Sequence, residues 1–140
     1  MSIDKNENEA QRWLKTASDD LDTAVILEKN GKFAHSYFHA QQAGEKALKS
    51  VWYFIDAVPW CHSIKKLIDD LENIELKVYN SLLNLKREAT ILNRFYIPTR
   101  YPNGLPDITP DEAYSEEDAN TCLKYARKII NAVQKILAHG

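Results

Sequence analysis

Residues 31–50 read GKFAHSYFHAQQAGEKALKS, and this stretch decides the fold. Apolar residues recur in it every three or four positions and continue to about residue 56, which is the spacing of a helix with one apolar side. Several residues of that side are small, so another helix is expected to approach it closely. Pro59 ends the segment because proline cannot continue a helix. The apolar side consists of Phe33, Tyr37, Ala40, Ala43, Gly44, Ala47, Leu48, Val51, Phe54 and Ile55.

The same spacing runs outward on both sides of this stretch. Before it, the pattern predicts a long helix that ends at Asn30 and Gly31, since both residues tolerate a left-handed C-terminal turn. After it, the pattern predicts a short helix over about 63–73 and a longer one over about 76–94. Ser115, followed by three acidic residues, predicts the N-cap of a last helix that keeps its spacing to the C-terminus.

No segment shows the alternation of a β-strand, and no internal repeat is evident. Helices with one apolar side each bury that side best against one another. The predicted fold class is therefore all-α: an antiparallel up-and-down helical bundle of four long helices plus one short helix, with a long Pro-rich loop before the last helix. At 140 residues, one domain over 1–140 is expected.

Composition excludes several classes of protein. The 18 basic and 20 acidic residues give a net charge of −2, so no global basic field points to nucleic acid. The polar N-terminus, MSIDKNENEA, lacks the apolar core of a signal peptide, and no run is long enough to span a membrane. The two cysteines show no metal-ligand spacing, so free thiols and a cytoplasmic location are expected.

Asp20 is a polar residue that a plain bundle does not need. On the first helix it lies at the flank of the apolar side, where an unpaired carboxylate would be costly. Three interpretations remain open: a structural pair with an arginine or tyrosine of another helix, a solvated position at the edge of the apolar side, or a ligand-binding or catalytic carboxylate.

The far side of the second helix raises a similar question. Phe38, Gln41, Glu45 and Trp52 lie there, and a solvent-exposed helix surface does not normally carry both a phenylalanine and a tryptophan. Either the long loop or a second subunit covers this side, and a homodimer through this helix is the prediction. Its polar residues, which include an i,i+4 pair of Glu45 and Lys49, are expected to form a solvated, ion-paired surface. Gln42 and Lys46 belong to the same surface.

The histidines give no metal site. His35 and His39 have an i,i+4 spacing that can hold zinc, but no third ligand accompanies them, so no metal and no cofactor are predicted. His62 follows Cys61 directly and reads as a turn residue, or as the N-cap of the short helix in place of Ser63.

The connection before the last helix contains RFYIPTRYPNGLPD at residues 94–107, which is longer than most helix–helix connections. Arg100, together with Arg87 and Arg94 on the preceding helix, can form an anion site in which Tyr96 or Tyr101 stacks a base. The alternative is structural. The prolines then stiffen a crossover, the tyrosines pack on the bundle, and Arg100 pairs with a carboxylate such as Asp20 or Glu45.

Three blocks in this order resemble the HEPN domain, a helical domain of bacteria and archaea. The first is ASDDLDTAVIL at 17–27, and the second is the stretch at 31–50 followed by HSIKKL at 62–67. The third is YIPTRYPNG at 96–104, followed by the last helix. The resemblance spans about 10–137. It implies an up-and-down bundle, and members of the family often dimerise.

The resemblance implies two functional branches. One consists of metal-independent ribonucleases that use an Arg-x4–6-His motif, but no arginine of this chain has a histidine at that spacing. The other resembles the helical domain of aminoglycoside nucleotidyltransferases and works beside a minimal nucleotidyltransferase domain. The positions that match this branch are Asp20, Glu45, Lys46, Arg100 and Tyr101.

We therefore predict a non-catalytic HEPN protein that binds a nucleotide or phosphorylated ligand and works with a nucleotidyltransferase partner. Lys46 and Arg100 would meet phosphate, Tyr101 would stack or hydrogen-bond, and Glu45 or Asp20 would hold the arginine or a ribose hydroxyl. One alternative is a protein-interaction or antitoxin-type module that binds through Phe38, Gln41 and Trp52. Another is a ribonuclease with a different residue set.

Overall fold

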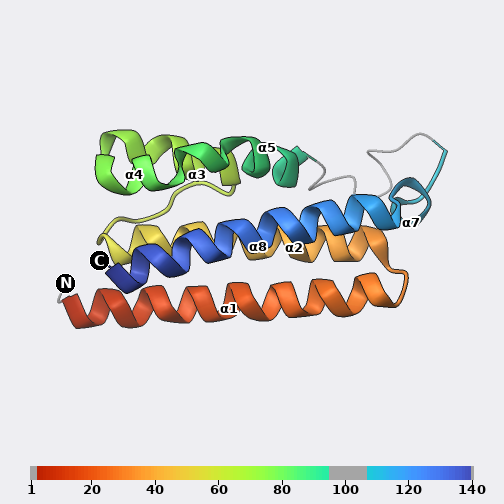
Figure 1. The fold of residues 1–140 in the computed structure, drawn as a ribbon, viewed down its shortest axis with the longest axis horizontal. Helices are drawn as coiled ribbons and strands as arrows, with labels where there is room; N and C mark the ends of the chain where they lie inside the picture. Colours follow the sequence, from red (N-terminus) through yellow and green to blue (C-terminus); the bar gives the residue numbers. More distant parts are fainter. Residues whose placement is uncertain (1–2, 95–106, 140) are drawn as a thin grey trace.

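The computed structural model describes residues 3–94 and 107–139, and every regular element in these ranges is helical. The helices form three layers (Figure 1). Helix α1 (Ile3–Lys29) is one outer layer, and α2 (Phe33–Phe54) with α8 (Glu116–His139) is the middle one. The predicted all-α bundle is confirmed. None of the described helices combines the length and apolarity needed to cross a bilayer.

The other outer layer is a chain of short helices that lies over α2 and α8, on the side away from α1 (Figure 1). The turn between its two halves reverses the chain, so α4 and α5 run in the same direction as α1 (Figure 1). Its elements are α3 (Ile64–Asp69), the 3₁₀ helix η1 (Asp70–Asn73), α4 (Leu76–Leu82), the 3₁₀ helix η2 (Leu83–Leu85) and α5 (Lys86–Arg94).

This layer corrects one prediction, because residues 76–94 are three short elements rather than one long helix. The 3₁₀ turn lies among Asn80, Ser81 and Asn84, whose side chains compete with helical backbone hydrogen bonds. The tighter turn still places Leu82 and Leu85 against the core. The polar residues near the turn thus interrupt the helix predicted over 76–94, while the apolar spacing keeps its buried side against the core.

The predicted helix ends are confirmed by their hydrogen bonds. Gly31 has φ +76°, and the amide of Lys32 donates to the carbonyl of Leu27 at 2.9 Å, which closes α1 in a left-handed C-terminal turn. The Ser63 side chain accepts from the amide of Lys66 and so caps α3. Ser115 and Asp118 cap α8 reciprocally, after the four-residue helix α7 (Pro110–Ala113).

The middle of the bundle is built on small residues, as the sequence predicts. All seven alanines of α1 and α2 are fully buried, and these two helices pack against each other. At Gly44, an added Cβ would lie 3.2 Å from Leu92 Cδ1 and 3.3 Å from Ile64 Cδ1. Helices α3 and α5 therefore meet α2 where it has no side chain. The buried alanines of α1 and α2 are Ala10, Ala17, Ala24, Ala34, Ala40, Ala43 and Ala47.

Candidate functional site

A buried carboxylate, that of Glu45, lies in the middle of the polar side of α2. Glu45 is 6% exposed, and its Oε2 lies 2.9 Å from Lys49 Nζ and 3.3 Å from His62 Nδ1. Gln41 Nε2 donates to its other oxygen at 3.4 Å. A carboxylate and an ammonium this deeply buried are stable only together, because either one alone would be an uncompensated buried charge.

His62 joins this cluster from the connection between α2 and α3. Its side chain is 84% exposed, while its Nδ1 lies 3.0 Å from Lys49 Nζ as well as near Glu45. A ring that accepts from Lys49 at Nδ1 carries its proton on Nε2, whereas a ring with a proton on Nδ1 donates to Glu45. The cluster thus holds an exposed imidazole in place through a buried ion pair.

A second ion pair lies on the side of α2 that faces α1. Lys46 Nζ is 2.7 Å from Asp20 Oδ2, and the two side chains are 27% and 20% exposed. His39 lies near this pair: burial lowers the pKa of its imidazole from the ordinary 6.5, and the positive charge of Lys46 acts in the same direction while Asp20 opposes it. We call the side of α2 that carries Gln42, Glu45, Lys46 and Lys49 the polar strip.

An aromatic pair lies beside the polar strip. The rings of Trp13 and Tyr53 stack with centroids 5.2 Å apart, and Lys49 Nζ lies 5.9 Å from the Trp13 ring centroid. The indole nitrogen of Trp13 donates to Glu9 at 3.2 Å. The aromatic stack and the two ion pairs therefore lie along α2, and Trp13 and Asp20 join them from α1.

These contacts test the sequence interpretation of individual residues. Asp20 has a partner, as expected, but it is a lysine and not the predicted arginine or tyrosine. Glu45 and Lys49 form the expected i,i+4 pair, yet they are buried, so the prediction of a solvated surface is wrong for them. His62 is not the cap of α3, because Ser63 is. Sequence reasoning missed His62 as the further partner of Glu45 and Lys49, although His62 begins the block HSIKKL at 62–67.

The predicted partner surface is largely covered by the chain itself. Trp52 is 5% exposed and its indole nitrogen donates to the carbonyl of Leu67 at 3.0 Å, so α3 covers it. Gln41 is buried in the Glu45 cluster, while Phe38 is half-buried. Arg100 and Tyr101 lie outside the described residues.

The described part of the polar strip carries no cluster of metal ligands. No group of three histidine, cysteine or carboxylate side chains gathers in residues 3–94 and 107–139 in a way that could hold a metal ion. Two described grooves lie elsewhere, one between α4 and α8 and one beside Trp60. Of the polar strip, Glu45 and Lys49 are buried, while the Lys46 side chain is 27% exposed.

The chain belongs to the HEPN family, since the model of the HEPN domain matches residues 10–136. It is 30% identical over 134 residues to "Putative toxin MJ1304" of Methanocaldococcus jannaschii, covering 91% of this chain and 88% of that protein. Solved structures are similar to this chain as well.

Two crystal structures illustrate this similarity. TT1696 from Thermus thermophilus superposes with a TM-score of 0.82 at 35% identity, covering 91% of this chain and 98% of that one. ST0689, an archaeal HEPN homologue, superposes with a TM-score of 0.73 at 31% identity, covering 92% and 98%.

Proposed function

We propose that this protein is a HEPN module of the toxin–antitoxin type that binds a nucleotide or another phosphorylated ligand along the polar strip of α2. It would act with a nucleotidyltransferase-domain protein and as a homodimer. The observation that carries the proposal is the combination of Lys46, Lys49 and the exposed His62 with the Trp13–Tyr53 stack. Cations and an imidazole suit phosphate, and an aromatic face suits a base.

Charge balance limits how a phosphate would bind. Lys46 and Lys49 are already paired with carboxylates, so a phosphate would share them rather than meet bare cations. Asp20 and Glu45 would then hold the ammonium groups in position or accept from a ribose hydroxyl. Arg100 and Tyr101, which lie outside the described residues, are proposed to supply the further cation and ring.

A thermal-shift titration tests the site. We expect one of ATP, GTP, CTP, UTP or their monophosphates, with or without magnesium, to raise the melting temperature by several degrees, since a ligand at about 100 times its Kd adds roughly 2.7 kcal/mol. Lys46→Ala and Arg100→Ala should abolish this ligand-dependent shift. Lys65→Ala is the matched control, because Lys65 is ion-paired on α3 with Asp69. A flat response across the panel would contradict the proposal.

A second candidate function is that of a ribonuclease that does not use the Arg-x4–6-His motif. Two observations favour it: the similarity to "Putative toxin MJ1304" and the geometry of His62. The neutral tautomer with its proton on Nδ1 donates to Glu45 and leaves the exposed Nε2 free to take a proton from a ribose 2′-hydroxyl. Purified protein should then cleave a labelled single-stranded RNA, and His62→Ala should remove that activity. Cleavage that survives His62→Ala would exclude this assignment.

The homodimer is tested separately by light scattering. We expect twice the mass of 16.1 kDa at tens of micromolar protein. Because Gln41 and Trp52 are covered within the chain, Phe38→Ala is the informative variant of the predicted partner surface. A monodisperse monomer would contradict the dimer and would leave the ligand proposal to its own test.

A further inference from the structure

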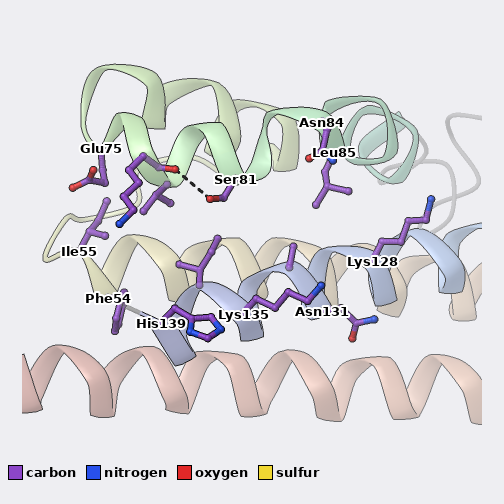
Figure 2. A pocket seen from close by; sticks show the side chains of 14 residues that line it. Phe54, Ile55, Glu75, Ser81, Asn84, Leu85, Lys128, Asn131, Lys135 and His139 are labelled. Carbon is purple, nitrogen blue, oxygen red and sulfur yellow. Dashed lines mark hydrogen bonds between the residues drawn. The ribbon is translucent and has the colours of Figure 1, made fainter.

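A groove of about 820 Å³ runs between α4–η2 and the C-terminal half of α8 (Figure 2). Its apolar surface comes from Val78 and Leu85 of the short helices and from Ala132 and Ile136 of α8. Phe54 and Ile55, at the C-terminal end of α2, line it as well. Leu85 points from its wall toward α8 in Figure 2. The groove shares no residue with the polar strip, and it lies at the opposite end of the bundle from α7 (Figure 1).

Basic side chains line the rim of this groove. Lys128 and Lys135 project from α8 (Figure 2), Lys77 belongs to α4, and all three are exposed. None of them forms an ion pair within residues 3–94 and 107–139, whereas Lys46, Lys49, Lys65, Lys66 and Lys86 all do. Glu75 is the acidic residue of the lining. Three exposed lysines without an ion pair among the described residues thus surround one apolar groove.

We propose that this groove is the docking site for an acidic amphipathic helix of a partner protein. The α8 wall from Lys128 to His139 is roughly 17 Å long, which matches about three turns of a helix. The partner's leucine-like side chains would enter the apolar groove, as in other helix-in-groove complexes. Its carboxylates, spaced seven residues apart, would meet Lys128 and Lys135, which have the same spacing.

The chemistry of the groove favours a helix over other anionic partners. A nucleic acid would place charged phosphates over Val78 and Ile136 and would leave their apolar surface unused. A membrane would need a convex or flat apolar surface, whereas this surface is concave between two walls. An acidic helix matches both the apolar groove and the cationic rim.

The test uses the full chain and a capped synthetic peptide with leucines on one helical face and glutamates seven residues apart beside it. Fluorescence anisotropy should give a micromolar-range Kd, and Lys128→Glu with Lys135→Glu should weaken binding about tenfold or more. A matched peptide with lysines in place of the glutamates should prefer this double variant. Lys15→Glu with Lys32→Glu, two exposed positions outside the groove, makes the same charge change and should leave the Kd unaltered.

Several results would overturn the proposal. These are absence of peptide binding, equal weakening by the control pair, or stronger groove-dependent binding of poly(U) or anionic vesicles. A fall in oligomer mass in the Lys128→Glu, Lys135→Glu variant would assign the groove to a second copy of the chain instead. The nucleotide-dependent thermal shift should persist in this variant, so the failure of one proposal is distinguishable from the failure of the other.

Discussion

Glu45 shows how a single buried residue can organise a site. Its carboxylate is the common partner of Lys49, His62 and Gln41. Glu45→Ala would leave the Lys49 ammonium buried without a counter-charge, so we expect the free energy of unfolding to fall by about 3–5 kcal/mol. Glu45→Leu combined with Lys49→Met should recover most of this loss. Urea denaturation measures both, and a loss below about 1 kcal/mol in Glu45→Ala would contradict the assigned role.

The two cysteines are expected to differ sharply in reactivity. Burial raises the pKa of the Cys122 thiol to about 12 from the ordinary 9.0, and a hydrogen bond with Tyr37 only partly opposes this. Cys61 is half-buried in the connection before α3. Since the thiolate is the reactive form, Ellman's reagent should modify one thiol in the native protein and both after unfolding. Cys61→Ser should abolish native labelling, and rapid native labelling of that variant would show that Cys122 is accessible.

His39 gives the fold a pH dependence of known sign. Its folded pKa is lowered by burial below the ordinary 6.5, so the unfolded chain binds a proton more readily. Its contribution to stability is therefore complete above pH 6.5 and is lost as the pH falls from there through the folded pKa. His39→Gln should flatten this part of the stability profile. A histidine resonance assigned to His39 that titrates above 6.5 by NMR would refute the argument.

At the scale of the element, α2 is the helix against which the rest of the bundle packs. Gly44 faces Leu92 and Ile64 so closely that an added methyl group must displace them by a few tenths of an ångström. Gly44→Ala should be nearly neutral, because alanine gains helix propensity of about 1 kcal/mol. Gly44→Val should cost about 1–3 kcal/mol through overpacking. If Gly44→Val is as stable as Gly44→Ala, or more stable, in thermal unfolding, the inference of close packing at Gly44 is wrong.

The elements also show what a single sequence can and cannot predict. Apolar spacing and caps predicted the C-terminal end of α1 and the bounds of α2 and α8, because these signals are local in the chain. The pairing of Lys46 with Asp20 depends on how α1 and α2 are rotated against each other, and one helical pattern does not contain that angle. The position of His62 depends on a connection that folds back toward Glu45. Local rules predicted the elements, and tertiary geometry selected the contacts.

At the scale of the whole molecule, the three long helices and the layer of short helices differ in how firmly they are held. Leu82 is the buried residue of α4, whereas α2 has fourteen buried residues and contacts both α1 and α8. Local opening has a lower free energy where fewer apolar contacts must be broken. Native-state hydrogen exchange should therefore be slowest in α2 and faster in α4 and η2, which form one wall of the groove.

The acidic peptide should slow exchange in α4 and η2 more than in α1, because it would bridge that wall to α8. Uniform protection across all helices, with or without peptide, would contradict this order of stability.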